Sequence, residues 1–399
     1  MRRRFLWIGG LVEEQYMDVR VGRFCLELGE NKVLGVGGGC PPGTPVHGDA
    51  VLMPGLCNAH IHLPDAAIAD AGEELSLHEL VAQPRGLKYR LLAATGPEKV
   101  FSAAAELLSS YRREGVLLLG AYVEPGFLAV TARAAAATSV VLRLFAQPGE
   151  KRYSALLQLI NSNMWIGLDT PLDLEPWELR RVAQDAYARG LRVAAHVSED
   201  EALAKIGDLR VAVESGVHTA IHLTHASPGE ALLAAREGVA PIYCPLANLY
   251  FAGAAPPADA LLALYDEAAP LALGSDNAAW PPQGMGLLLA SAYSVYRVGL
   301  GGRSREALAR ALLYAATVGC GRVLAAEPGW QVRRVPLLGH SLSPTIGLVK
   351  RLYFSRLLLV AEPPRVLESS SSSLSASPLT ASSSSSSPNT LFAGTGSEG

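Results

Sequence analysis

The sequence lacks the signals of several classes of protein. Its 34 Lys and Arg residues nearly balance its 37 Asp and Glu residues, for a formal net charge of −3 over 399 residues. A balance this close gives no broad basic surface for nucleic acid or for an acidic membrane. No apolar run reaches the roughly 18 residues that cross a bilayer. We therefore expect neither nucleic acid nor a membrane among the partners of this chain.

Cysteine is also scarce and scattered. The five cysteines, an odd number, show no CxxC spacing; they are Cys25, Cys40, Cys57, Cys244 and Cys320. A disulfide framework has an even number of cysteines at regular spacings. We therefore predict reduced, buried thiols in an intracellular protein. Cys244 is interpreted as a packed thiol and not a nucleophile, because no histidine is placed to activate it.

The first residues, MRRRFLWIGG, begin like a signal peptide, with three arginines before an apolar stretch. Gly9 and Gly10 interrupt that stretch, and Glu13 and Glu14 end it. No small-residue cleavage site follows, as a signal peptide would require. We interpret the segment as a first β-strand and expect a cytoplasmic protein.

Repeated strand and helix patterns fill residues 51–326. Short apolar runs alternate there with Ala-, Leu- and Arg-rich segments of helical period, as in successive βα units. Helices are predicted at 97–115, 175–190 and 227–238, and the last two end in glycine. The eight predicted strands are 51–62, 115–122, 139–147, 164–170, 191–196, 219–223, 239–245 and 270–276. This pattern predicts a (β/α)8 barrel; no GxGxxG or P-loop motif supports the alternative, a doubly wound open sheet.

The segments before and after the barrel region have a different sequence pattern. Residues 1–50 contain strand-like runs separated by glycine-rich turns, and 327–368 returns to such runs, for example GWQVRRV. These strands could pair with one another in a second, small β-domain. Residues 369–399 are rich in serine with almost no apolar content. Because such a segment does not offset the entropy of ordering, we predict a disordered tail there.

Two histidines one residue apart end the first predicted barrel strand, in LMPGLCNAHIHL. Side chains alternate between the faces of a strand, so His60 and His62 point to the same side. In a barrel that side can be the interior, near the C-terminal mouth where active sites are built. Two imidazoles there suit Zn²⁺ or Fe²⁺. The alternative is a pair of core histidines bonded to backbone carbonyls.

Other candidate ligands lie where later predicted strands end. LRVAAHVSED places His196 at a strand end, TAIHLTHAS places His222 there, and LALGSDN places Asp276 there. His222 and His225 are three residues apart and face opposite sides of one strand, so only one of them can point inward. We favour His222. Asp276 could instead cap the segment that follows it.

The motifs PGLCNAHIHL, AAHVSE, HLTHAS and LGSDN, in that order, resemble the metal-dependent amidohydrolase superfamily. Within it they are most similar to the branch of cytosine, guanine and adenosine-type deaminases and triazine chlorohydrolases. The resemblance runs from about residue 5 to 326, and more weakly to 368. It implies a (β/α)8 barrel with a composite β-sandwich built from both chain ends.

The resemblance also implies a role for each residue. Glu199 would be the proton shuttle, His222 would orient the attacking water, and Asp276 would carry the water's proton to departing ammonia. For this, the chain must fold back after His196, because strand alternation alone would place Glu199 on the opposite face. Binuclear members bridge two metals with a carbamylated lysine on the fourth strand, but MWIGLDTP has no lysine, so we predict one divalent ion, Zn²⁺ or Fe²⁺. Its implied ligands are His60, His62, His196 and Asp276.

The substrate is not determined by these motifs. The main hypothesis is an enzyme that deaminates an amino-substituted nitrogen heterocycle or nucleoside, with a homo-oligomer left open. One alternative is hydrolysis of an amide or C–Cl bond by the same activated water. Another is a barrel that keeps the fold without catalysis. Polar residues at strand ends that could contact a small-molecule substrate are Glu124, Gln147, Asp169, Asn248 and Asn277.

Overall fold

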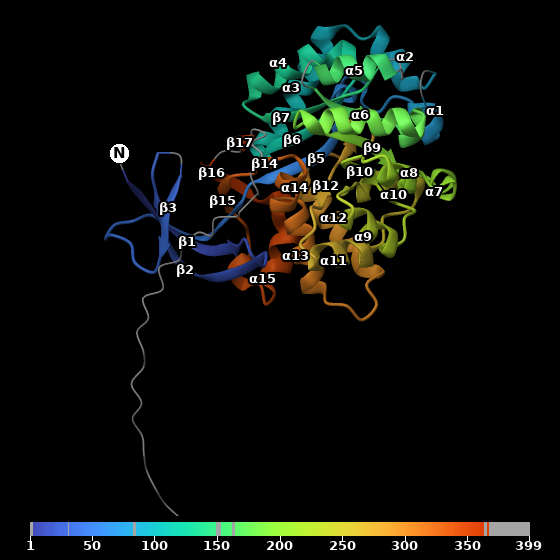
Figure 1. Ribbon diagram of the computed structural model, residues 1–399. Coiled ribbons are helices and arrows are strands. Elements are labelled where there is room, and N and C mark those ends of the chain that lie inside the picture. Colours follow the sequence, from blue (N-terminus) through green and yellow to red (C-terminus); the bar gives the residue numbers. More distant parts are fainter. Residues whose placement is uncertain are drawn as a thin grey trace, which may run out of the picture. The chain divides into compact units, whose positions relative to one another are not determined.

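Nine strands form one parallel sheet that curls back on itself (Figure 1). Neighbouring strands follow chain order from β5 to β12, and β13 returns to β5 through the pair Asn277–His62. β12 and β13 are two parts of the predicted eighth strand, separated by Gly274 and Ser275. This α/β topology is that of a TIM-type barrel. The strands are β5 (Leu56–His62), β6 (Val116–Val123), β7 (Val141–Ala146), β8 (Trp165–Leu168), β9 (Val193–Val197), β10 (Thr219–His222), β11 (Ala240–Tyr243), β12 (Ala272–Leu273) and β13 (Asp276–Asn277).

This computed structural model describes most of the chain ahead of the serine-rich segment. The predicted disordered tail at 369–399 lies outside the described residues. The described ranges are 3–30, 32–82, 85–148, 153–161, 164–362 and 365–366.

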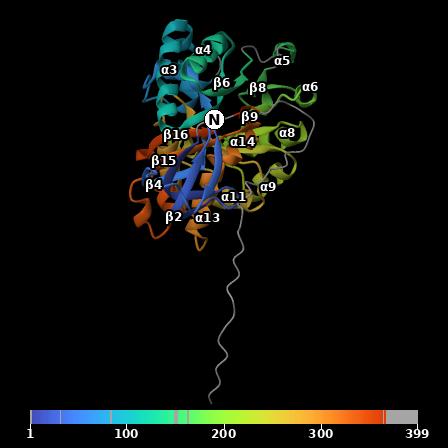
Figure 2. The ribbon, with the colours of Figure 1, turned by 90° about the vertical axis from the view of Figure 1, so that its left-hand side faces the viewer.

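Helices follow the barrel strands and cover the outside of the sheet (Figures 1 and 2). Three confirm predicted helices: α3 (Pro97–Glu114), α6 (Pro176–Ala188) and α9 (Pro228–Arg236). Each begins with proline, whose missing N–H is not needed in the first turn. No described helix is both long and apolar enough to span a membrane. The other helices are α1 (Leu77–Val81), α2 (Leu87–Ala94), α4 (Leu128–Thr138), α5 (Tyr153–Asn161), α7 (Glu201–Ile206), α8 (Asp208–Glu214), α10 (Pro245–Ala252), α11 (Ala258–Asp266), α12 (Met285–Val298), α13 (Arg305–Ala315), α14 (Val318–Val323) and α15 (Pro344–Arg351).

Two arginines and a tryptophan fill the base of the barrel. The guanidinium carbons of Arg143 and Arg192 lie 4.2 and 5.4 Å from the centre of the Trp165 ring. Their N–H groups donate hydrogen bonds to the carbonyl oxygens of residues 323–325. These carbonyls mark the end of α14, where partial negative charge favours a cation. The layer therefore joins β7, β8 and the residue just before β9 to the C-terminal end of α14.

A tyrosine–phenylalanine layer lies between this base and the mouth. Tyr122 stacks on Phe145 with ring centres 5.1 Å apart. The centre of the Tyr122 ring also lies 4.6 Å from that of the His60 ring and 5.1 Å from that of the His196 ring. A Cβ at Gly167 would meet the Tyr122 ring at 2.4 Å. Glycine at position 167 therefore leaves room for the ring that supports these two histidines.

Gly167→Ala is expected to lower the free energy of unfolding by about 1–3 kcal/mol, because an extra methyl group would overpack this layer. Chemical denaturation of both proteins measures the difference. Gly126→Ala is the matched control, since a Cβ at Gly126 would meet nothing within 4 Å. Equal losses in the two variants would contradict the packing argument.

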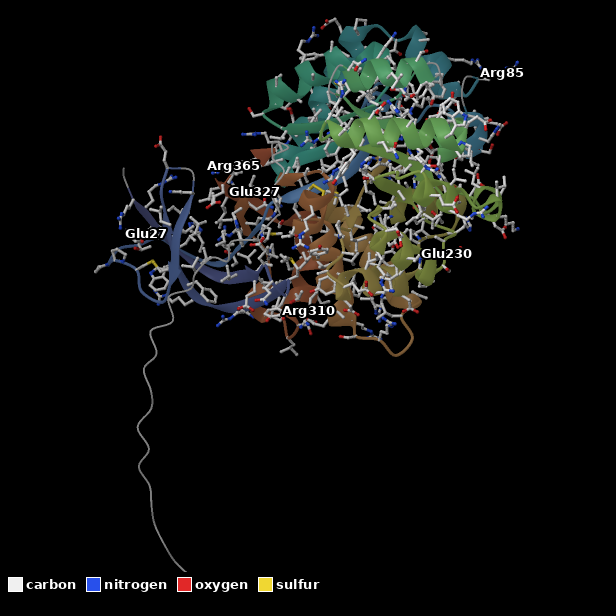
Figure 3. The ribbon with its side chains drawn as sticks, viewed as in Figure 1. Glu27, Arg85, Glu230, Arg310, Glu327 and Arg365 are labelled. Atoms are coloured by element: carbon white, nitrogen blue, oxygen red, sulfur yellow. A yellow bond between two sulfur atoms is a disulfide. The ribbon has the colours of Figure 1, made fainter. Side chains whose placement is uncertain are left out.

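Strands from both chain ends pair in a six-stranded sheet, ordered β16-β15-β4-β1-β2-β3. The predicted pairing of the two ends is thus observed, as a single sheet; a sandwich remains a prediction. Arg310 of α13, labelled in Figure 3, forms an ion pair of 2.7 Å with Asp18 of β2. The strands are β1 (Arg4–Glu13), β2 (Asp18–Leu28), β3 (Val33–Gly37), β4 (Val46–Pro54), β15 (Trp330–Arg334) and β16 (Arg356–Glu362), while β14 (Ala326–Glu327) pairs separately with β17 (Arg365–Val366).

The predicted strand at 51–62 is divided in the structure. Its first part belongs to β4 of the six-stranded sheet, and its second part is β5 of the barrel. The break falls at Gly55, whose N–H donates to the carbonyl of Gly329 at 2.8 Å. A Cβ at Gly55 would lie 2.0 Å from the carbonyl oxygen of Pro328. A close backbone contact with the C-terminal region therefore directs one continuous apolar run into two sheets.

The prediction of reduced cysteines is wrong for four of the five. Cys25 and Cys40 form one disulfide, and Cys57 and Cys320 form another (Figure 3). The second bond joins residues 263 positions apart in the sequence, so no local spacing could reveal it. Its partners meet because α14 packs against β5. Cys244 is free and buried, as predicted.

His218, at the start of β10, is expected to make stability depend on pH. Burial, and secondarily Arg192, lowers the pKa of His218 to about 4, and its Nδ1 accepts a hydrogen bond from the Val193 N–H at 3.1 Å. The unfolded chain, with an ordinary histidine pKa, takes up this proton first as pH falls. Stability from neutral His218 is therefore full above about pH 6.5, and up to about 3 kcal/mol of it is lost toward pH 4.

His218→Asn keeps an acceptor for the Val193 N–H but has no proton to gain. The difference in unfolding free energy between wild type and variant, measured by denaturation at pH 7.5 and pH 4.5, is expected to shrink at the lower pH. A difference that stays constant would show that His218 does not titrate in this way.

Candidate active site

The predicted ligand side chains meet at the C-terminal ends of barrel strands. One ligand atom from each of His60, His196, His222 and Asp276 lies within 4.8 Å of the other three. His62, two residues after His60 on β5, joins the same group through His196 and Asp276. All five side chains are buried. The ends of β5, β9, β10 and β13 therefore bring these residues together.

Distances between the implied ligands suit a single divalent ion. The Nε2 atom of His60 lies 3.1 Å from Asp276 Oδ1. The Nε2 atom of His62 lies 3.3 Å from His196 Nε2 and 3.5 Å from Asp276 Oδ1. A tetrahedral ion with bonds of about 2.0–2.1 Å would hold its ligand atoms about 3.3 Å apart. The donor set and its spacing therefore fit the metal that the resemblance implies.

Hydrogen bonds outside this group separate the roles of two histidines. His196 Nδ1 lies 3.1 Å from the carbonyl oxygen of Leu168 and must donate to it, which leaves Nε2 with a lone pair. His222 Nδ1 accepts from Asn248 Nδ2 at 2.9 Å, which leaves the proton on Nε2. His196 is thus prepared to ligate a cation, and His222 to donate a hydrogen bond.

Burial keeps the imidazoles neutral and the carboxylate ionised. Burial lowers the pKa of His60, His62, His196 and His222 below the usual value. Burial opposes ionisation of Asp276, but the hydrogen bond from His60 and the surrounding histidines outweigh it and lower its pKa. Neutral imidazole and ionised carboxylate are the forms that bind a metal.

Glu199 returns to the site through a turn just after β9. Ser198 has a left-handed φ of +48°. Its N–H and its hydroxyl both donate to the buried Asp208 carboxylate, at 2.6 and 2.8 Å. The turn brings Glu199 Oε1 to 3.6 Å from His222 Nε2. Burial, with the charge of Asp276 second, raises the pKa of Glu199 to about 8, so this carboxyl can hold a proton at neutral pH.

Two residues of the site have a left-handed backbone conformation. His222 has φ +78° and Asp276 has φ +64°. Left-handed residues other than glycine are uncommon and concentrate at functional sites. His225, the alternative to His222, is exposed, and its backbone N–H donates to the Ser198 carbonyl. Of the two histidines, His222 is the buried one that lies within the group, and its role stays a prediction.

The five predicted substrate contacts have different surroundings. Asn248 orients His222, as described above, and Asn277 Nδ2 donates to Asp65 Oδ2 at 2.7 Å. Gln147 Nε2 donates to Asp169 Oδ1 at 2.8 Å. Glu124 lies at the end of β6 beside a buried cation. Asn248 and Asn277 therefore hold neighbouring side chains in place, and substrate contact by any of the five remains a prediction.

The buried cation is Lys88, which the sequence analysis did not identify. Its Nζ lies 2.9 Å from Asp65 Oδ2, 3.0 Å from Glu124 Oε1 and 3.3 Å from His62 Nδ1. Burial alone would lower the pKa of Lys88, but Asp65 and Glu124 outweigh it and raise it. The only sequence signal was a lysine four residues before Leu92, on the buried face of α2.

Comparison with known proteins supports the fold. No family model matches the chain. A putative aminohydrolase of Methanothermobacter thermautotrophicus is 25% identical over 262 residues, which are 59% of this chain and 66% of that protein. The chain therefore spans just under two thirds of the length of that relative.

Solved structures extend the match to nearly the whole chain. An adenosine deaminase from Xanthomonas campestris with bound zinc has a TM-score of 0.71 and 20% identity, covering 91% of this chain and 92% of its own. The chain therefore shares its fold with this deaminase. An atrazine chlorohydrolase from Arthrobacter aurescens, complexed with zinc, has a TM-score of 0.70 and 16% identity, covering 91% and 97%. In a barrel of this topology, the strand ends that carry the His and Asp group lie at the mouth.

Proposed function

We propose that this chain is a metal-dependent amidohydrolase that releases ammonia from an amino-substituted nitrogen heterocycle or nucleoside. The observation that carries the proposal is the spacing of 3.1–3.5 Å among His60, His62, His196 and Asp276. These residues would hold one divalent ion, Zn²⁺ or Fe²⁺. When bound, such an ion lowers the pKa of water to about 7 and so supplies a nucleophile at neutral pH.

The residues around this position have complementary proton roles. Asp276 accepts a proton from the attacking water, and the His222 Nε2–H donates to that water and orients it. Glu199 gives its proton to the ring nitrogen beside the reacting carbon. A C–O bond forms, the C–N bond to the amino group breaks, and Asp276 returns its proton to the departing ammonia. The second water proton passes to Glu199, which restores its starting state.

The raised pKa of the Glu199 carboxyl supports deamination over the alternatives. Protonating a ring nitrogen needs an acid in place before attack, and Glu199 has the raised pKa that this role requires. Hydrolysis of a C–Cl bond or an amide by the same water is the second candidate, supported by the chlorohydrolase among the structural neighbours. A non-catalytic barrel is disfavoured because every implied ligand is present.

Ammonia release from a panel of purines, pyrimidines, pterins and triazines tests the function. Protein reconstituted with Zn²⁺ is expected to release ammonia from at least one compound, and chelator-treated protein from none. Stoichiometric metal binding without ammonia from any compound would exclude deamination. Release of chloride from chlorotriazines, or of an amine from amides, would then identify the alternative hydrolysis.

We propose further that the six-stranded sheet is the small β-domain of the family and that the enzyme acts in the cytoplasm on a small molecule. The position of β4 between β1 and β15, which come from the two chain ends, supports the first point. Complete burial of Cys57 and Cys320 would protect their disulfide from reduction there. A homo-oligomer is tested by light scattering.

A further inference from the structure

Two polar side chains with buried oxygen atoms follow neighbouring strands at the barrel mouth. Tyr122 and Phe145 stack inside the barrel on β6 and β7. Glu124 and Gln147 lie two residues farther along the same strands and so face the same side. The backbone remains strand-like at both positions: Glu124 is extended, and the Gln147 N–H donates to the carbonyl of Val123 at 2.9 Å.

A carboxylate fixes the orientation of the Gln147 amide. Gln147 Nε2 donates to Asp169 Oδ1 at 2.8 Å. Since an ionised carboxylate only accepts hydrogen bonds, the amide nitrogen must face Asp169 and the amide oxygen must face away. Gln147 is 2% exposed, and its Oε1 is buried without a hydrogen-bond partner among the described residues. Gln147 therefore presents an unpaired acceptor.

Lys88 fixes the second acceptor. Its ammonium lies 3.0 Å from Glu124 Oε1 and is held on its other side by Asp65 at 2.9 Å. The other carboxylate oxygen, Glu124 Oε2, is buried and has no hydrogen-bond partner in the part of the chain that the structure describes. Buried acceptors are normally paired, because an unpaired one has lost its bonds to water and gained none in return. Two unpaired acceptors side by side indicate a ligand that supplies donors.

We propose that Glu124 Oε2 and Gln147 Oε1 select substrates that carry hydrogen-bond donors on the edge facing β6 and β7. This inference rests on the proposed function and specifies its substrate class. The donors are either an amino group on the ring, beyond the one that is removed, or hydroxyl groups of an attached sugar. A compound with a halogen or hydrogen at that edge leaves both acceptors unpaired. Lys88 and Asp169 act as positioning residues for this selection.

Two pairs of compounds distinguish the sources of the donors. In the first pair, 2,6-diaminopurine carries an amino group where 2-fluoroadenine carries fluorine. In the second pair, adenosine carries sugar hydroxyls that 2′,3′-dideoxyadenosine lacks. Dissociation constants are measured by calorimetry on Zn²⁺-loaded Glu199→Gln protein, so that no compound is consumed. The donor-bearing member of at least one pair is expected to bind about 10- to 100-fold more tightly.

Glu124→Gln provides the decisive variant. Lys88 only donates hydrogen bonds, so the new amide must turn its oxygen toward Lys88 and its NH2 group toward the mouth. An acceptor becomes a donor without a change in size. The preference found with the parent protein is therefore expected to fall by at least about 10-fold or to reverse. Should Glu124→Gln fail to fold, Gln147→Met removes the neighbouring acceptor and is expected to reduce the same preference.

Thr131→Val is the matched control. Thr131 Oγ1 is also buried without a hydrogen-bond partner among the described residues, but it lies on α4 and not at the mouth. This variant should leave the preference unchanged. Equal binding within both pairs, or a preference that Glu124→Gln and Gln147→Met leave intact, would overturn the inference. Absence of ammonia release from the wild-type protein would instead overturn the proposed function, because the binding preference does not require turnover.

Discussion

Replacing Glu199 with glutamine is expected to lower ammonia release by about 10³-fold while metal binding is retained. The substitution keeps the size of the side chain and its hydrogen-bonding reach but removes the proton that the ring nitrogen must receive. General acid–base catalysis of this kind contributes typically about 10²–10⁴-fold. Glu199 is not among the implied ligands, so Zn²⁺ content should match that of the wild type. Steady-state kinetics and metal analysis on the same samples check both expectations.

Glu201→Gln is the control for this experiment. It makes the same chemical change two residues away, where Glu201 is exposed and paired with Lys205 at 2.8 Å. Its activity should stay close to that of the wild type. A similar loss of activity in both variants, or a Glu199→Gln protein that turns over at the wild-type rate, would rule out the acid role.

Removing the Cys57–Cys320 disulfide is expected to cost about 5 kcal/mol of unfolding free energy. A cross-link stabilises mainly by restricting the unfolded chain, and the restriction grows with the length of the closed loop. This bond closes a loop of 263 residues, whereas Cys25–Cys40 closes one of 15. The shorter loop is expected to contribute about 3 kcal/mol. Denaturation of the Cys57→Ala/Cys320→Ala and Cys25→Ala/Cys40→Ala proteins measures each contribution.

The two bonds should also differ in their response to reductant. Cys57 and Cys320 are completely buried, whereas Cys40 is partly exposed. Thiol attack needs access to sulfur, so a mild reductant should open Cys25–Cys40 first.

If the double variant at Cys57 and Cys320 were as stable as the wild type, the long cross-link would not stabilise the fold.

The convergence of the candidate ligands could be predicted from the sequence because each lies at the end of a short apolar run. In a parallel barrel all strand ends with the same direction meet at one mouth, so His60, His196 and Asp276 converge from distant parts of the chain. The position of Glu199 was harder to derive. It depends on a left-handed Ser198 held by Asp208, and no residue type requires that conformation.

Features that depend on long-range contacts could not be predicted. The division of one apolar run at Gly55 follows from contact with Pro328, which is far away in the sequence. The Cys57–Cys320 bond depends on where α14 packs. Lys88 is buried only because Asp65 and Glu124 arrive from two other segments to neutralise it. In each case the sequence shows the residue but not the partner that determines its role.

The filled base of the barrel limits where a reactant can enter and leave. Since Arg143, Trp165 and Arg192 occupy the interior below the tyrosine layer, we expect reactants to enter and leave at the mouth. Under the proposed function, the ring product and ammonia would share the entrance used by the next substrate. The larger product would then obstruct that entrance until it left, and accumulated product should slow turnover by competition.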